Sequence, residues 1–205
     1  MERINEIAKF VSPYKIISDV GCDHGYTIKC AFDNYGITKA YAIDNKVGPL
    51  NQAILNLKDY NEVIFSLSDG LDDLQLDTEV LIISGLGGDL IRNILESNFY
   101  KLNNVKRIVI EANSKDKVVR QFLLTNGYTL EAEEIIDDDG YYIIDVFTKG
   151  DHDFSELEIK YGPFFLREKN EMFIDYWNQK IDSLLAQDNE YTIQKANKIK
   201  KELNL

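Results

Sequence analysis

Short apolar runs alternate with amphipathic stretches along the first three quarters of the chain. Each apolar run ends near a glycine, an acidic residue or another turn signal, and such runs predict strands. The predicted strands cover 16–20, 39–44, 63–68, 80–84, 105–111, 128–136 and 141–149. The stretches between the early strands place apolar residues at helical spacing. The predicted helices cover 26–35, 48–59, 88–97 and 115–126.

Strands that alternate with helices predict a mostly parallel sheet covered on both faces. The last two strands are joined by the acidic turn 137–140, which is a strong hairpin signal. An antiparallel hairpin that closes such a sheet resembles the Class I methyltransferases. We therefore expect an α/β, Rossmann-like domain over residues 1–150. Asn113 or Ser114 is a candidate N-cap for its last helix, and Gly127 is a candidate stop.

The sequence changes character after Gly150, and no strand pattern is found from Arg167 onward. Two stretches there carry apolar residues at helical spacing, with a turn at 187–189 between them. These apolar residues are Ile174, Trp177, Ile181, Leu184 or Leu185, Ile193, Ala196, Ile199 and Leu203. We expect a small helical, coiled-coil-like domain over residues 151–205, formed by an antiparallel helix pair or a short coiled coil.

Composition restricts the partners and the compartment. A net charge of −12 argues against broad, non-specific nucleic-acid binding, although it leaves room for local basic groups such as the lysines near the C-terminus. No apolar run approaches the roughly 18 residues of a membrane span, and the first ten residues lack a signal-peptide core. We expect a cytoplasmic protein without membrane association. The two cysteines predict neither a disulfide framework nor a metal site.

Acidic residues and glycines stand where the first three strands end. Asp19 and Gly21 belong to a glycine-containing turn that follows the first strand and opens a helix. Asp44 and the adjacent Asn45 end the second strand, where an acidic residue accepts hydrogen bonds from ribose hydroxyls. Asp69 and Gly70 follow the third strand, where a carboxylate suits an adenine amino group. This pattern predicts an adenosyl ligand across the carboxyl edge of the sheet.

The charge of the first turn favours S-adenosylmethionine (SAM) over a nicotinamide dinucleotide. Asp23 stands inside this turn and would repel a pyrophosphate, whereas the sulfonium of SAM is positively charged and lacks phosphate. Two roles remain open for Asp19, which either holds the loop or faces the methionine amino group. We therefore predict SAM as the cofactor.

Several motifs in order give the chain a specific resemblance to a family. The segment 17–26 (ISDVGCDHGY) resembles the signature of the bacterial tRNA (adenine-22-N1)-methyltransferases, the TrmK family. Further segments that resemble the family are Gly48-Pro49, 68–71, 83–88, 111–113, 126–128 and 161–163. The chain departs from the family pattern at Gly25, at Leu86 and at Glu111-Ala112, where the family has Ala, Met and Gln-Pro.

The resemblance implies SAM-dependent methyl transfer to N1 of a tRNA adenine, at position 22. N1 carries its own lone pair, so catalysis would consist mainly of positioning. Asp23 and His24 are the first candidates for the acceptor side. Asn113 either bonds to the adenine edge or caps its helix. The glycine-rich loop 85–88 would form the wall of the pocket, with Gly85, Leu86 and Gly87 as cofactor-binding residues. Arg3 resembles a family arginine and is a candidate for contact with RNA.

Two other functions remain open at this stage. One is a SAM-dependent methyltransferase of a small molecule, with the C-terminal helices as a lid or dimer contact. The other is a non-catalytic protein that binds SAM and RNA. The expected partner is tRNA, no metal is predicted, and we expect a monomer or a weak homodimer.

Overall fold

The computed structural model describes residues 2–205, which form two compact units. The first unit extends to His152, and the second unit is Asp153–Leu205. The division lies close to Gly150, where the character of the sequence changes. Each unit is described by itself below.

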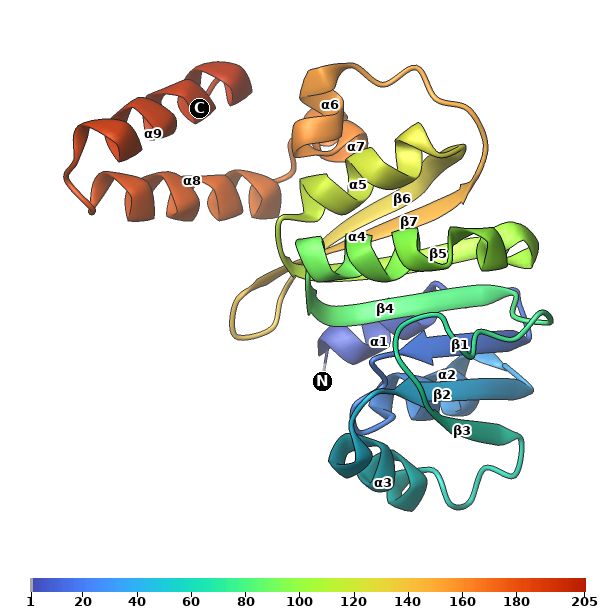
Figure 1. Cartoon of the computed structure of the whole chain (residues 1–205). Coiled ribbons are helices and arrows are strands. Elements are labelled where there is room, and N and C mark those ends of the chain that lie inside the picture. Colours follow the sequence, from blue (N-terminus) through green and yellow to red (C-terminus); the bar gives the residue numbers. More distant parts are fainter. Residues whose placement is uncertain (1) are drawn as a thin grey trace. The chain divides into compact units, whose positions relative to one another are not determined.

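The first unit is built on one seven-stranded sheet, in the order β3-β2-β1-β4-β5-β7-β6 (Figure 1). Strands β1 to β5 pair in parallel, and β7 lies antiparallel between β5 and β6. The strands are β1 Ile16–Val20, β2 Lys39–Asp44, β3 Val63–Leu67, β4 Val80–Gly87, β5 Arg107–Ser114, β6 Tyr128–Asp137 and β7 Tyr141–Lys149. The predicted mostly parallel sheet with a closing antiparallel hairpin is confirmed.

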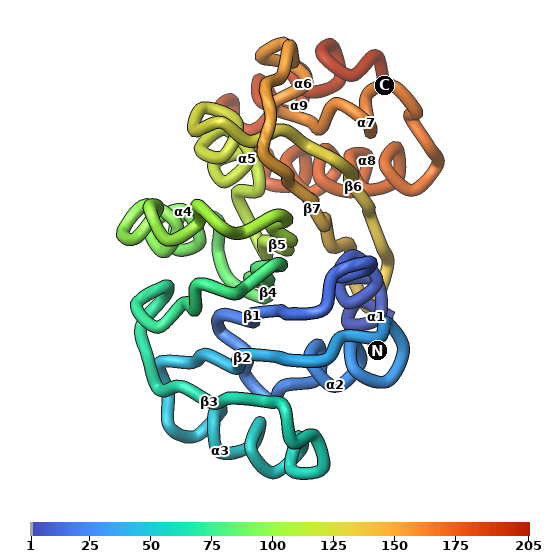
Figure 2. Tube along the Cα trace, turned by 90° about the vertical axis from the view of Figure 1, so that its right-hand side faces the viewer, coloured from blue at the N-terminus to red at the C-terminus, as the bar shows by residue number. Residues whose placement is uncertain are grey.

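Helices cover both faces of this sheet (Figures 1 and 2). One face carries α1 (Glu2–Lys9), α2 (Tyr26–Tyr35) and α3 (Val47–Asn56), and the other carries α4 (Gly88–Ser97) and α5 (Asp116–Thr125). A 3₁₀ helix, η1 (Phe99–Asn104), follows α4. Successive side chains of a strand point to opposite faces, so a strand covered on both sides is apolar throughout. Residues 80–83 of β4 are accordingly all buried.

Helix α1 was not expected from the sequence. Its charged residues were interpreted only as a segment without a signal-peptide core, but they leave one side of the helix apolar. Ile7 and Ala8 are buried on this side, in the core cluster that also holds Ile28 and Ala31 of α2. A helix of eight residues is too short to be recognised from periodicity alone.

The predicted N-cap of the last domain helix is wrong. Helix α5 begins at Asp116 after Lys115, whose φ is +57°, whereas Asn113 and Ser114 both belong to β5. Strand β5 continues to Ser114 because β4 also continues to Gly87, and the two extensions pair with register shifts. Gly127 follows the end of α5 with φ +82°, as the sequence predicts for a helix stop.

The second unit is helical, as predicted. It contains α6 (Glu156–Tyr161), α7 (Pro163–Glu168), α8 (Glu171–Leu185) and α9 (Glu190–Leu203). Helices α8 and α9 run antiparallel (Figure 1). Each begins at an asparagine whose side chain accepts a backbone N–H: Asn170 from Phe173 at 2.9 Å and Asn189 from Thr192 at 3.0 Å. Within residues 2–205, no helix is both long and apolar enough to span a membrane.

Gly88 generates a test of the contact between α4 and the β5–α5 turn. A Cβ at this position would lie 2.4 Å from the carbonyl oxygen of Lys115. We expect Gly88→Ala to lower the free energy of unfolding by about 1–3 kcal/mol, because the backbone must shift. Urea denaturation measures the change.

Gly48 provides the matched control for this substitution. It also stands in the first turn of a helix, but a Cβ there meets nothing within 4 Å. Gly48→Ala should leave stability unchanged or raise it by up to about 1 kcal/mol. Equal effects of the two substitutions would contradict the proposed contact.

Candidate functional site

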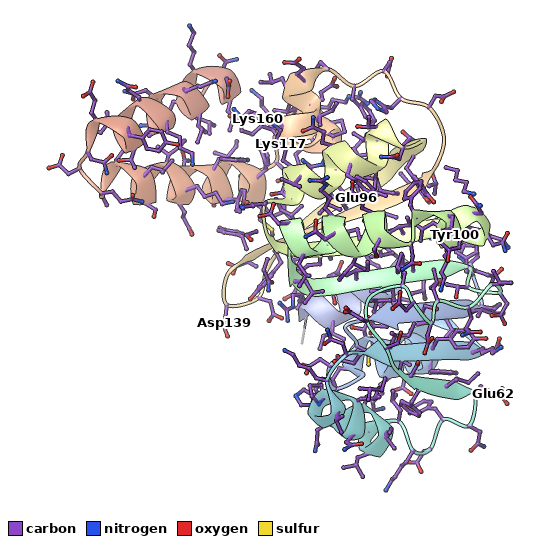
Figure 3. All side chains as sticks on the ribbon, in the orientation of Figure 1. Glu62, Glu96, Tyr100, Lys117, Asp139 and Lys160 are labelled. Carbon is purple, nitrogen blue, oxygen red and sulfur yellow. The ribbon has the colours of Figure 1, made fainter. Side chains whose placement is uncertain are left out.

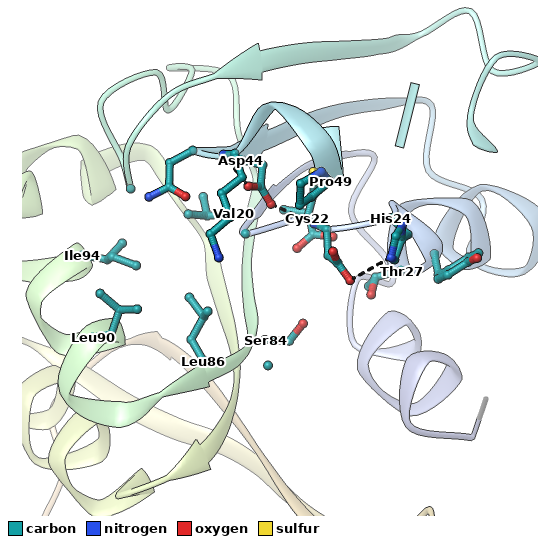
Figure 4. A pocket seen from close by; sticks show the side chains of 18 of the residues that line it. Val20, Cys22, His24, Thr27, Asp44, Pro49, Ser84, Leu86, Leu90 and Ile94 are labelled. Carbon is teal, nitrogen blue, oxygen red and sulfur yellow. Dashed lines mark hydrogen bonds and ion pairs between the residues drawn. The ribbon is translucent and has the colours of Figure 1, made fainter. Parts of the chain in front are cut away.

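A pocket of about 510 Å³ lies at the carboxyl edge of the sheet (Figure 4). The ends of β1, β2 and β4 and the loops after β1, β2 and β3 form its base, and residues from α1, α4 and β5 complete the wall. This is the edge at which ligands bind in open parallel sheets.

The pocket brings together most of the residues that the sequence singled out. Those that line it are Asp19, Gly21, Asp23, His24, Asp44, Asn45, Asp69, Gly70, Gly85, Leu86 and Asn113. Gly87 does not line the pocket and lies at the junction of β4 and α4. Gly88 was expected in the pocket wall, but its missing side chain instead admits the Lys115 carbonyl oxygen.

The Asp44 carboxylate connects two loops of the pocket. One oxygen accepts the N–H of Asp23 at 3.1 Å, and the other accepts the N–H of Lys46 at 2.8 Å. Asp44 is only 7 % exposed, so these bonds are shielded from water. Each carboxylate oxygen has two lone pairs, and each therefore keeps the capacity to accept a ligand hydroxyl.

The first turn bends sharply through glycines. The N–H of Gly21, whose φ is +76°, donates to the carbonyl of Ile43 at 2.9 Å, and this bond holds the turn against the end of β2. Gly25 has φ +73°, and a Cβ there would lie 2.6 Å from Cδ1 of Leu57. The left-handed backbone conformation at this position favours glycine, and a Cβ there would also require the Leu57 side chain, just after α3, to move.

Asp19 is buried beneath the pocket without a hydrogen-bond partner for Oδ1 among the described residues. Burial raises the pKa of its carboxyl to about 7, and the nearby Asp44 and Asp23 carboxylates raise it further. A charged carboxylate that is buried without a hydrogen-bond partner lowers the stability of the folded state. A cationic hydrogen-bond donor in the pocket would offset this loss of stability.

Asp69 lies in the loop after β3 and is exposed. Its Oδ1 accepts a hydrogen bond from Nδ2 of Asn45 at 3.1 Å, so the residues that end β2 and follow β3 are linked. The backbone turns immediately afterwards at Gly70, whose φ is +51°. The second carboxylate oxygen of Asp69 receives no bond from the described residues.

The Gly85 peptide is held on both sides. Its N–H donates to Oε2 of Glu111 at 2.9 Å, and its carbonyl oxygen accepts Nδ2 of Asn113 at 2.6 Å. Asn113 therefore positions the loop and does not cap a helix. Glu111 is a site residue whose role the sequence did not reveal: it was noticed only as a departure from the family glutamine.

Glu111 is fully buried, and burial raises the pKa of its carboxyl. The nearest cation is Arg3, whose Nη1 lies 3.9 Å from Oε2 of Glu111. The guanidinium of Arg3 also lies 4.5 Å from the centre of the Tyr142 ring. Arg3 lines the pocket, so α1 contributes a charged side chain to its wall.

His24 and Asp23 form the exposed rim of the pocket. Nε2 of His24 lies 3.7 Å from Oδ2 of Asp23, and the two side chains are 44 % and 66 % exposed. The backbone of His24 is fixed because its carbonyl accepts Nδ2 of Asn56 at 3.0 Å. Its ring centre lies 5.8 Å from that of Tyr26. Both side chains are therefore available to a ligand that enters from solvent.

An apolar wall faces this rim. Leu86, Leu90 and Ile94 lie on one side of the pocket, and His24 and Thr27 lie on the other (Figure 4). Four aspartates line the pocket against two basic residues, Arg3 and Lys46. The arrangement suits a ligand with a cationic group, hydroxyls and a planar apolar part. No group of three or more side chains suited to a metal ion occurs in residues 2–205.

Comparison with known proteins identifies similar chains over most of this length. The model of a family described as TrmK, tRNA (adenine(22)-N(1))-methyltransferase, matches residues 17–205. The tRNA (adenine(22)-N(1))-methyltransferase of Bacillus subtilis (strain 168) is 28% identical over 191 residues. This match covers 88% of the present chain and 80% of the B. subtilis protein.

Solved structures extend the similarity to three dimensions. The Streptococcus pneumoniae protein Sp1610 in complex with S-adenosyl-L-methionine is 29% identical, with a TM-score of 0.91 and coverage of 99% of both chains. M. capricolum TrmK in complex with S-adenosyl-homocysteine is 28% identical, with a TM-score of 0.86, and the match covers 100% of this chain and 97% of that one.

The buried Asp19 carboxyl generates a prediction about stability. Burial raises the pKa of this carboxyl from its ordinary value of 3.8 to about 7, so the folded state binds more protons than the unfolded state between these pH values. The stability contributed by this proton is present at low pH and is lost as pH rises through 7. Asp19→Asn, which cannot ionise, should therefore stabilise the ligand-free protein at pH 8 by on the order of 3 kcal/mol.

The measurement is urea denaturation of both proteins at pH 5 and pH 8. The advantage of Asp19→Asn should be larger at pH 8, where wild-type Asp19 is charged. Asp59→Asn, at an exposed position, is the control and should show no such pH dependence. A stability difference that is the same at both pH values would contradict the raised pKa of Asp19.

Proposed function

The chain belongs to the TrmK family of tRNA (adenine(22)-N(1))-methyltransferases, and from this premise we propose that its acidic pocket binds SAM beside N1 of adenine 22 of a tRNA. SAM-dependent tRNA (adenine-N1)-methyltransferase activity follows from the family and from similar proteins solved with SAM and its product. The observation that carries the placement is the unpartnered Asp19 carboxylate at the base of the pocket. A tRNA substrate also favours the cytoplasm, and the monomer or weak homodimer stays a prediction.

In this proposal, three carboxylates each bind a different part of the cofactor. Asp19 faces the methionine ammonium, because its buried oxygen lacks a donor. Asp44, with Asn45, accepts the ribose hydroxyls, and Asp69 accepts the adenine amino group. Gly21 and Gly70 allow the backbone to approach the ligand closely. When bound, SAM supplies an electrophilic methyl carbon, whose bond to sulfur breaks with both electrons going to sulfur while the adenine N1 lone pair forms the new bond.

The rim and the Gly85 loop form the acceptor side. An adenine in folded tRNA must leave its stack to reach the pocket. The Gly85 loop, held by Glu111 and Asn113, presents Leu86 to the flipped base. His24 offers an imidazole face for stacking. Adenine becomes cationic when N1 is methylated. The exposed carboxylate of Asp23 stabilises that positive charge, and any amino proton that neutralises the base leaves to solvent.

One experiment tests the function directly. Incubation of the protein with SAM and unmodified tRNA, followed by mass spectrometry of the nucleosides, should reveal 1-methyladenosine. Sequencing by reverse transcription should place the modification at position 22. Methyl transfer to a metabolite extract but not to tRNA would support the small-molecule alternative. Tight tRNA binding without any methylated base would support the non-catalytic one.

His24 generates a prediction about catalysis. His24→Ala should leave SAM affinity unchanged, because the side chain lies on the exposed rim, and should lower the single-turnover rate of methyl transfer by about 10-fold or more. The second histidine, His152, lies outside the pocket, and His152→Ala is the control. Equal single-turnover rates in wild type and His24→Ala would remove His24 from the mechanism.

Asp69 generates a prediction about cofactor binding. Asp69→Ala should weaken SAM binding by about 1–3 kcal/mol, because a charge-assisted hydrogen bond to the adenine amino group is lost. Isothermal titration calorimetry measures the affinity. Asp59→Ala serves as the control, since Asp59 is exposed and does not line the pocket. Wild-type affinity in Asp69→Ala would place the adenine elsewhere.

A further inference from the structure

Helix α1 brings one charged side chain, Arg3, to the wall of the methylation pocket. Two contacts hold Arg3 in place. Its backbone N–H donates to Oδ2 of Asp138 at 3.1 Å, and its guanidinium lies 4.5 Å from the centre of the Tyr142 ring. Asp138 belongs to the turn between β6 and β7, and Asp139 lies at the tip of this hairpin (Figure 3). The hairpin therefore fixes the position from which Arg3 reaches the pocket.

Glu111 is a buried carboxyl that depends on this cation. One of its oxygens, Oε2, accepts the N–H of Gly85 at 2.9 Å, and Nη1 of Arg3 lies 3.9 Å from the same oxygen. The other oxygen, Oε1, has no hydrogen-bond partner in the described part of the chain. Burial raises the pKa of Glu111, whereas the Gly85 N–H and the positive charge of Arg3 lower it. Arg3 therefore favours the charged form of a carboxyl that burial favours as neutral.

Other ionisable side chains share the face of the sheet on which Glu111 lies, or belong to α1, which covers it. The strand registers and the contacts of α1 place there Asp19, Asp44, Arg107, Glu131, Glu134, Tyr142, Glu6 and Lys9. The two cations in this list, Lys9 and Arg107, are already paired with glutamates. The aspartates oppose a second negative charge nearby. Arg3 is thus the cation that acts on Glu111.

We propose that Arg3 is a positioning residue for methyl transfer, because it keeps Glu111 charged and charged Glu111 fixes the Gly85 loop. A hydrogen bond to a charged acceptor is about twice as strong as one to a neutral acceptor. Loss of the charge therefore loosens the bond that holds the Gly85 peptide. Leu86 follows Gly85 and lines the pocket, so a looser loop places the acceptor less accurately. The inference rests on the proposed function in one respect, that this loop receives the adenine.

The first test is a pH titration of the Gly85 amide by nuclear magnetic resonance, which needs neither tRNA nor cofactor. In the wild type, the amide proton signal should move downfield as Glu111 becomes charged. In Arg3→Gln, the midpoint of this movement should lie at higher pH, because the cation that favours the charged form is absent. Glu111→Gln should remove the movement and so identify its source. An equal midpoint in the wild type and Arg3→Gln would overturn the proposal.

The matched control removes another arginine of the same unit. Arg92 does not line the pocket and pairs with Glu96 on the exposed face of α4, at 2.9 Å (Figure 3). Arg92→Gln changes the net charge by the same amount as Arg3→Gln. Its Gly85 midpoint should stay at the wild-type value. If both variants shift the midpoint equally, the effect comes from net charge and the proposed pairing fails.

The second test measures single-turnover methyl transfer to tRNA at saturating SAM. Arg3→Gln should lower the rate about 10-fold at pH 7. The loss should become smaller at pH 9, where Glu111 is charged without help from Arg3. In the Glu111→Gln background, the amide oxygen accepts the Gly85 N–H in a neutral form at every pH, so Arg3→Gln should cause no further loss. An equal loss in both backgrounds that persists at pH 9 would show that Arg3 acts directly on tRNA or cofactor, and would overturn the proposal.

The two tests separate this inference from the proposed function. If the wild type forms no 1-methyladenosine in tRNA, the proposed function fails, and the Gly85 titration still decides whether Arg3 acts on Glu111. If 1-methyladenosine forms but the Gly85 midpoint does not shift in Arg3→Gln, the positioning role alone fails. Circular dichroism of each variant checks that the helices remain folded.

Discussion

The Asp44 carboxylate joins two loops that leave different strands, and the shape of the methyltransferase site depends on it. Its oxygens accept the N–H groups of Asp23 and Lys46, so the turn after β1 and the loop after β2 are fixed relative to one another. Asp44 is buried, so water cannot take its place as the acceptor of these two N–H groups. Loss of the carboxylate would leave both loops free to move apart. The positions of Asp23 and of the adjacent His24 relative to the loop after β2 depend on these two hydrogen bonds.

Much of the fold and part of the site could be predicted from the sequence, for a physical reason. Parallel strands covered on both faces must be apolar throughout, so their limits are visible as short runs. Parallel pairing also brings the carboxyl ends of successive strands to one edge. Asp19, Asp44 and Asp69 could therefore be placed together without any knowledge of side-chain contacts, and all three line one pocket.

The remaining features depend on contacts between distant residues. Glu111 holds the N–H of Gly85, 26 positions away, and no local pattern indicates this bond. Asn113 was a candidate helix cap, but β4 and β5 extend far enough to make it a strand residue. Its side chain there holds the loop at Gly85. Helix α6 is different, because its capping box of Ser155 and Glu158 is a local signal in the sequence that indicates the start of a helix.

The unpartnered Asp19 carboxylate allows a bound cation to change the stability of the folded chain. A ligand that binds only the folded chain stabilises it by mass action, and this effect is largest where the empty pocket carries an uncompensated charge. Proteases degrade a chain through its transiently open forms, whose population rises as stability falls. The folded chain without a cation at Asp19 therefore opens more often, and is cut by proteases more readily, than the same chain with one bound.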